Sequence, residues 1–125
     1  MNIKHFPYSN VEEKSVKDFG STGTTIRVFI SEDEAPNFIM RRFEIQPGGQ
    51  IGVHSHNWEH EIFILKGEVI LTNKDGEREK VSQGEFVFIP PNEPHGYINE
   101  DSETFEFLCI IPAKKEAIPE SEWVD

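Results

Sequence analysis

The chain of 125 residues is poor in cysteine: Cys109 is the only one, so no disulfide bond can form within the chain. A chain without paired cysteines is typical of a reducing compartment, and we expect a cytoplasmic protein. Long apolar runs are also missing. Residues 62–65 and 105–111 are too short to cross a bilayer, and the first residues do not have the pattern of a signal peptide.

Basic residues are scarce as well. The chain has 12 Lys and Arg against 23 Asp and Glu, which gives a net charge of −11. Nucleic acids and anionic membrane surfaces both require clustered basic side chains, so we expect neither partner. The length corresponds to one domain, large enough to bury a core around one site. We therefore expect a small-molecule substrate or ligand.

Most of the chain has the pattern of short strands. Residues 26–30 and 86–89 are runs of β-branched and aromatic residues, and similar runs recur between Gly, Pro, Asn and Asp. This pattern predicts an all-β sandwich or barrel. The expected strands are 26–30, 38–45, 61–65, 68–72, 78–81, 86–89, 97–98 and 105–111.

Turn signals separate these strands. Asp75 and Gly76 can supply the positive φ angles of a tight hairpin. Pro47 and the two glycines after it are expected to end the preceding strand sharply. Residues 90–94 contain three prolines, which lack an N–H donor, so this segment is predicted to be a loop.

The two ends differ from the middle of the chain. Residues 1–24 are polar and loosely patterned, and we expect an arm that packs on a partner subunit. Residues 113–125 form a charged tail, in which residues 119–123 are predicted to make one helical turn that docks Trp123. The core of the single domain is therefore expected at approximately 25–112.

Four of the five histidines lie in two short windows of the chain. His54 and His56 are two residues apart, so in a strand their side chains point to the same face. A third ligand can return after a bend, and His95 from a distant strand can complete the site. Counting forward from His56 allows either His60 or Glu61 as this third ligand. Imidazole nitrogens suit several first-row divalent metals.

Two segments resemble the motifs of a known family. Residues 48–67 resemble the first cupin motif: a glycine, five residues, His-x-His, a third ligand and a glycine. Residues 84–99 resemble the second motif, with His95 as its ligand. Asn92 stands where the family usually has Gly, and Asn tolerates the left-handed region best among other residues. The resemblance implies a cupin β-barrel (a double-stranded β-helix or jelly roll) that holds one divalent metal ion.

The resemblance also distinguishes His60 from Glu61. The family usually has six residues between the third ligand and the next glycine, here Gly67, and this spacing selects His60. Glu59 and Glu61 are then expected to orient an imidazole N–H, with plain surface carboxylates as the alternative. Four-histidine cupins of this kind bind manganese or similar ions, so we expect Mn, with Fe, Ni, Zn or Cu as alternatives. The implied metal ligands are His54, His56, His60 and His95.

The resemblance and strand alternation suggest which side chains surround the site. The expected pocket residues are Ile51, Tyr97, Phe107 and Cys109, and the alternative is that they only fill the barrel core. Arg41 and Arg42 are adjacent in an expected strand, so one of them must point inward. An inward Arg suits an anionic substrate group, while the alternative is an ion pair with surface carboxylates. Trp58 is either a lid over the cavity or a packing residue.

Three functions are compatible with such a site. The leading hypothesis is a metal-dependent oxidoreductase, resembling a dioxygenase, that uses dioxygen or peroxide on a small organic substrate, and the other two are alternatives to it. The second is a Lewis-acid isomerase or lyase of the sugar or keto-acid type, which would need an acid–base group such as Glu61 or Tyr97. The third is a non-catalytic module that binds a metal or a small ligand. We also expect a homodimer, because an open sheet edge needs cover.

Overall fold

The computed structural model describes residues 1–113, so the helical turn predicted around Trp123 lies outside the described residues. Almost all regular structure is β-strand, which confirms the all-β prediction. Two short 3₁₀ turns, η1 (Tyr8–Asn10) and η2 (Asp18–Gly20), precede the main strands. The strands are β1 (Lys14–Ser15), β2 (Thr22–Ile30), β3 (Phe38–His54), β4 (His60–Lys66), β5 (Glu68–Thr72), β6 (Arg78–Ser82), β7 (Phe86–Ile89), β8 (His95–Ile98) and β9 (Phe105–Pro112).

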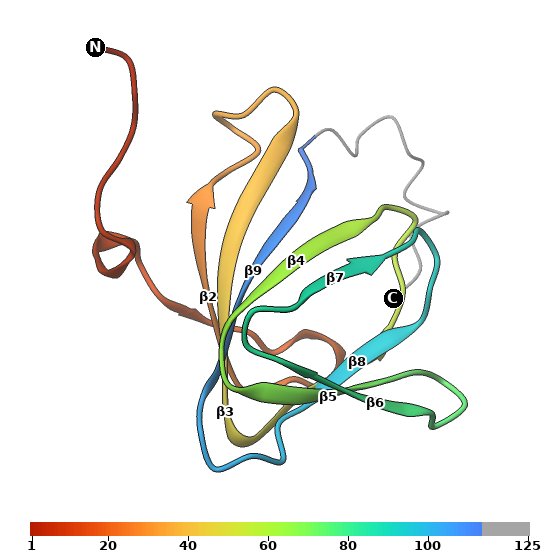
Figure 1. The fold of residues 1–125 in the computed structure, drawn as a ribbon. Coiled ribbons are helices and arrows are strands. Elements are labelled where there is room, and N and C mark those ends of the chain that lie inside the picture. Colours follow the sequence, from red (N-terminus) through yellow and green to blue (C-terminus); the bar gives the residue numbers. More distant parts are fainter. Residues whose placement is uncertain (114–125) are drawn as a thin grey trace.

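The strands form one curled antiparallel sheet (Figure 1). The strand order is β6-β5-β8-β3-β9-β4-β7, and β2 pairs with β3 while β1 pairs with β2. Most neighbours in this order are far apart in sequence. The distant motifs of the chain therefore meet in the sheet, and His54 of β3 lies opposite His95 of β8.

Strand β3 connects the two halves of the curled sheet. Residues 38–45 pair with β9, and residues 50–54 pair with β8. The prediction that Pro47 and the following glycines end this strand is wrong. Gly48 adopts φ +82°, which bends the strand, and β3 then continues to His54. After this bend, β3 leaves β9 and pairs with β8, so that His54 at its end lies opposite His95.

Two other turns show how local chemistry shapes the barrel rim. The β5–β6 connection is a five-residue loop over 73–77 and not the tight hairpin that was predicted, because only Gly76 has a positive φ angle. The Asn73 side-chain oxygen stabilises this loop by accepting hydrogen bonds from the backbone N–H groups of Asp75 and Glu77. Asn92 has φ +68°, as predicted, and its N–H donates to the carbonyl of His56 at 2.6 Å.

The core fills the interior of the curled sheet. In β9, buried and partly buried residues alternate along the strand, as expected when one face points inward. Aromatic rings from three strands stack inside: Phe43 on Phe107 with centroids 5.0 Å apart, and Tyr97 on Phe107 at 5.4 Å. The largest side chains that are completely buried are Phe105, Phe107, Ile45, Ile64, Val69, Asn99 and Cys109.

The N-terminal region has two parts. The first residues lie outside the barrel (Figure 1), where the Lys4 ammonium donates to the Phe29 carbonyl and pairs with Glu34. Residues 14–20 return to the barrel, and this segment, which we call the strap, runs from β1 through η2. The strap packs on its own chain.

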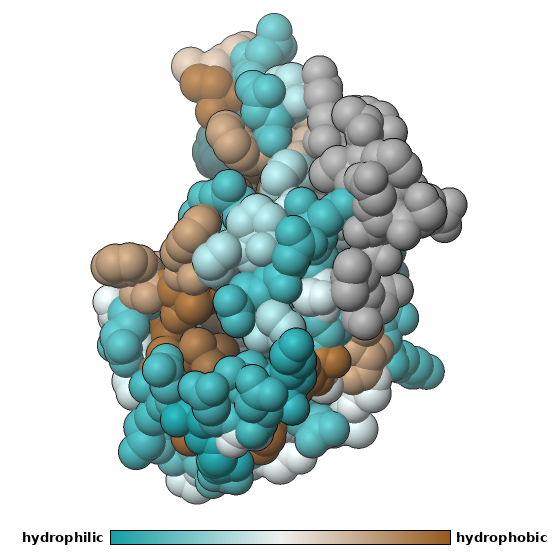
Figure 2. Space-filling view, turned by 90° about the vertical axis from the view of Figure 1, so that its right-hand side faces the viewer, coloured by the Kyte–Doolittle hydropathy of each residue, from teal (hydrophilic) through white to brown (hydrophobic). Residues whose placement is uncertain are grey.

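Polar and charged side chains cover most of the face drawn in Figure 2, and apolar side chains gather in patches between them. This surface agrees with the acidic composition of the chain. Residues 1–113 contain no helix of the length and apolar character needed to cross a membrane.

Candidate functional site

A cavity of about 400 Å³ opens inside the barrel. Its walls come from β2, β3, β4, β8, β9 and the strap. The four predicted metal ligands line this cavity together with the four predicted pocket residues. These eight residues are His54, His56, His60, His95, Ile51, Tyr97, Phe107 and Cys109.

The four histidine rings gather on one side of the cavity. His54 ends β3, His56 follows it, His60 begins β4, and His95 begins β8. The ring centroids of five of the six pairs are 4.5 to 6.1 Å apart, the shortest being His54 with His95. Imidazoles bound to one ion through nitrogens at about 2.1 Å have ring centres about 5 Å apart. The ring positions therefore suit a shared cation.

Hydrogen bonds fix the orientation of two of these rings. His54 Nδ1 lies 2.7 Å from the carbonyl oxygen of Gly52, and His95 Nδ1 lies 2.9 Å from that of Glu93. A carbonyl only accepts, so each Nδ1 carries the proton and each Nε2 keeps a lone pair. Metal-binding histidines commonly have this arrangement, in which one ring nitrogen donates to a backbone carbonyl.

His60 is held differently from the other two. Its Nδ1 lies 3.4 Å from Cys109 Sγ. The Nε2 atoms of His60 and His95 are buried and have no hydrogen-bond partner within the described part of the chain. Buried polar nitrogens without a partner are unfavourable, so these two atoms are suited to receive a ligand.

Burial in the cavity keeps His60 and His95 neutral. Burial, followed by the neighbouring charges of His95, Arg41, His56 and His54, lowers the pKa of His60 from 6.5 to about 2. Burial also lowers the pKa of His95 to about 4, against the hydrogen bond to Glu93. Neutral imidazole is the form that binds metals. Burial raises the pKa values of the Tyr97 phenol and the Cys109 thiol, so both remain protonated at neutral pH.

Two aromatic rings stack on His54 and His56 and restrict their orientation. Phe19 of the strap stacks on His54 with centroids 4.0 Å apart and planes 4° apart. Trp58 stacks on His56 at 4.4 Å and 13°. Trp58 is half-buried and packs against the core, so of its two predicted roles the structure supports packing.

The four histidine rings lie close together, but their nitrogens do not yet converge on one point. Within residues 1–113, no three or more His, Cys, Asp or Glu side chains are already arranged to hold a metal ion. A shared ion would therefore require some rings to turn about their side-chain bonds. The donor set fits a first-row divalent metal in its chemistry, since it offers neutral nitrogens, two of them buried without a partner.

The two glutamates lie away from the histidine cluster. Residues of β4 alternate between buried and exposed positions, with His60 buried and Glu61 exposed on the outer face. The neighbouring Glu59 carboxyl raises the pKa of Glu61. The prediction that Glu61 orients an imidazole is therefore wrong. Glu59 likewise interacts with the Glu61 carboxyl group. The ring nitrogens of His54, His60 and His95 instead contact Gly52, Cys109 and Glu93.

The structure adds residues that sequence reasoning did not place at the site. Val16, Lys17 and Phe19 of the strap line the cavity. Strand alternation carries no information about such a segment, because only Lys14–Ser15 of it is a strand. Arg41 also lines the cavity, so it is the inward member of the predicted arginine pair.

The fold and the histidine windows define a cupin, and comparisons with known proteins agree. The model of the Cupin_2 family, described as a cupin domain, matches residues 41–111. The chain therefore belongs to this family.

Three known proteins are similar to this chain. The polyketide cyclase RemF from Streptomyces resistomycificus is 36% identical, with a TM-score of 0.84 over 90% of this chain and 80% of that chain. A predicted oxalate decarboxylase from Thermotoga maritima is 24% identical, with a TM-score of 0.76 over 87% of this chain and 98% of the other, which supports the fold alone. An oxalate-binding protein of Thermotoga maritima is 31% identical over 74 residues. This match spans 58% of the chain and only 60% of that relative's length.

Proposed function

We propose that this cupin is a metal-dependent enzyme whose four histidines, His54, His56, His60 and His95, hold one divalent ion. The observation that carries the proposal is the pair of buried Nε2 atoms, on His60 and His95, that lack a partner among the described residues. Manganese is the expected metal, with Fe, Ni, Zn and Cu as alternatives. When bound, such an ion would supply Lewis-acid chemistry, since four neutral ligands leave its charge near +2.

The reaction that we favour is a Lewis-acid transformation of a carbonyl compound, of the isomerase, lyase or ring-closing kind. The likeness to a polyketide cyclase at 36% identity supports it. Tyr97 lies beside His95, with ring centroids 5.9 Å apart, and its phenol stays protonated. We assign Tyr97 the role of donating a hydrogen bond from its phenol oxygen to the substrate. The apolar walls exclude water from that contact.

The second candidate is the oxidoreductase that the sequence predicts, acting with dioxygen or peroxide on a small organic substrate. The neutral donor set supports it, because the absence of a carboxylate ligand favours the reduced state of a redox metal. The Cys109 thiol in the cavity would be exposed to any such oxidant.

One experiment tests the proposal and separates the candidates. Protein purified without chelator is analysed for metals by mass spectrometry, and the loaded and metal-stripped forms are then compared in two assays. The first assay follows exchange of the acidic C–H of a 1,3-diketone in deuterated water, and the second follows consumption of oxygen or peroxide. Metal-dependent exchange without an oxidant supports the Lewis-acid reaction, and metal-dependent oxidant consumption supports the oxidoreductase. Metal binding with neither activity indicates a binding module, and failure to bind any of the five metals overturns the proposal.

A further inference from the structure

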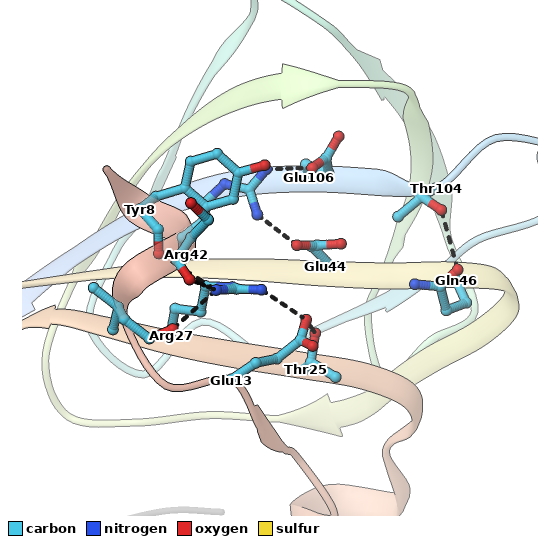
Figure 3. A network of polar contacts seen from close by, with 11 residues as sticks. Tyr8, Glu13, Thr25, Arg27, Arg42, Glu44, Gln46, Thr104 and Glu106 are labelled. Carbon is cyan, nitrogen blue, oxygen red and sulfur yellow. Dashed lines mark hydrogen bonds and ion pairs between the residues drawn. The ribbon is translucent and has the colours of Figure 1, made fainter. Parts of the chain in front are cut away.

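Arg41 and Arg42 are neighbours in β3 and face opposite sides of the sheet. Arg42 lies on the outer face, where its guanidinium bonds Glu44 at 2.5 Å and also pairs with Glu106 (Figure 3). The ring of Tyr8 covers it at 4.1 Å. The charge of this buried arginine is therefore balanced by two carboxylates, and despite the cost of burial its pKa is raised.

Arg41 has no such balance. Its side chain enters the cavity, where Nη2 donates to Cys109 Sγ at 3.0 Å and the guanidinium lies over the Phe43 ring at 5.0 Å. Its Nε is buried without a hydrogen-bond partner, and no carboxylate within residues 1–113 forms an ion pair with it. A partly buried guanidinium without a counter-charge is unfavourable, so the cavity has a place for an anion.

The charge of the cavity differs in sign from that of the whole chain. The chain carries a net charge of −11, yet three basic side chains line the cavity, namely Lys14, Lys17 and Arg41. Asp18 is the one acidic residue among the described residues that line it. Lys14 and Lys17 are exposed while Arg41 is partly buried, so the low-dielectric walls strengthen the potential of Arg41 most, and this potential attracts an anionic molecule into the barrel.

The wall beside Arg41 is aromatic. Phe43, Phe107 and Tyr97 form a continuous stack, with planes 10° and 23° apart in the two contacts. Such a wall suits a flat, conjugated molecule. Cys109 contacts both Arg41 and His60, so a small molecule bound at the guanidinium also reaches the histidine cluster.

We propose that Arg41 binds the carboxylate of a planar aromatic or conjugated substrate, which lies on the Phe43–Phe107–Tyr97 wall. The guanidinium matches a carboxylate in geometry and supplies the missing counter-charge. The reacting end of the substrate then faces the histidines, and this last point rests on the proposed function. The carboxylate contact does not depend on it.

Binding to metal-stripped protein tests the inference. Calorimetry compares cinnamate with cinnamamide, its neutral analogue, for the wild type, Arg41→Gln and Arg78→Gln, the last being an exposed arginine paired with Glu100. We expect the wild type to bind cinnamate about 10- to 100-fold more tightly than cinnamamide. Arg41→Gln should abolish this preference without weakening cinnamamide, and Arg78→Gln should retain it.

The variant Arg41→Lys and the metal-loaded protein provide two further comparisons. Arg41→Lys retains the charge and should keep part of the preference, and circular dichroism verifies that each variant is folded. Absence of millimolar cinnamate binding by the wild type, or a preference that survives Arg41→Gln, overturns the inference. A preference that appears only in metal-loaded protein and survives Arg41→Gln means that the metal binds the carboxylate, which also overturns it. Failure of the proposed function leaves the result on stripped protein unchanged, so the two failures are distinguishable.

Discussion

At the scale of single residues, one step along β4 decides the chemistry of the site. His60 is buried in the cavity while Glu61 is exposed on the outer face, so the alternation of the strand presents an imidazole and not a carboxylate. A carboxylate there would add a negative charge to the donor set. The neutral set instead keeps the charge of a bound cation available to a substrate.

We predict that His60→Ala weakens binding of the divalent metal by about 100-fold or more, since it removes a proposed ligand. Glu61→Ala is the matched control, because the neighbouring residue lies on the opposite face and should leave affinity within about threefold of wild type. Metal content after gel filtration and a competitive chelator titration measure both. Equal affinity of His60→Ala and wild type, or loss of metal from Glu61→Ala, would contradict the proposed ligand set.

The lowered pKa values of His60 and His95 predict that metal-free protein is destabilised by acid. The folded pKa values, about 2 and about 4, lie below the ordinary value of 6.5, so between these values the unfolded chain binds protons that the folded chain does not. The stability is fully present above pH 6.5 and is lost as the pH falls. Each histidine contributes a slope of about 1.4 kcal/mol per pH unit between 6.5 and its folded pKa.

Urea unfolding of chelator-treated protein at several pH values measures this slope. His60→Gln should remove about half of it between pH 6.5 and 4, because one of the two histidines no longer titrates. His5→Gln, at an exposed histidine, should leave it unchanged. A flat stability profile for the wild type in this range would contradict the prediction.

At the scale of elements, the sequence predicts strands well where side chains alternate. Residues 68–72 and 86–89 match β5 and β7 residue by residue, because β-branched and aromatic residues there are bounded by glycine and proline. The failure at Gly48 has a physical cause. A glycine with positive φ can end a strand or bend it, and only pairing with β8, more than forty residues away, makes β3 continue.

The strap could not be predicted in this way. It has no regular periodicity, and what holds it is tertiary: Phe19 adopts φ +59° and stacks on His54, while a Cβ on Gly52 would lie 2.1 Å from the Phe19 carbonyl oxygen. A positive φ is unusual for a bulky residue. The histidine windows were visible in the sequence because their spacing is local, whereas the part of the cavity wall formed by the strap is not.

We predict that Phe19→Ala opens the cavity to solvent, because it removes the ring that covers His54. Cys109 is the only thiol and lies buried in the cavity, so its rate of reaction with an aromatic disulfide reagent reports access. The rate should rise by about tenfold, which corresponds to about 1.4 kcal/mol in the free energy of opening. Phe6→Ala, outside the cavity, should react at the wild-type rate, and an unchanged rate for Phe19→Ala would rule out a covering role for the strap.

At the scale of the whole molecule, aromatic side chains gather on the outer face of the sheet as well as inside it. Phe63, Phe86 and Phe88 are 47%, 81% and 53% exposed, and Phe63 lies directly opposite Phe86 in the β4–β7 pair. Strand β7 also ends the sheet order, so one of its edges has no neighbouring strand among the described residues. An exposed edge and an apolar patch together are typical of a surface that associates.

We predict that the chain forms a homodimer through this β4–β7 face, as expected from the sequence. Phe86 is the most exposed of the three aromatics, so Phe86→Asp should place a charge at the centre of the buried contact and yield monomer at micromolar concentration. Lys80→Asp on β6, at the opposite end of the sheet order, changes the charge by two units, against one for Phe86→Asp, and should remain dimeric. Sedimentation velocity measures all three proteins. A monomeric wild type would contradict the dimer itself. A dimeric Phe86→Asp variant would show that the interface lies on another face, since an aspartate buried in the interface without a partner would be too unfavourable.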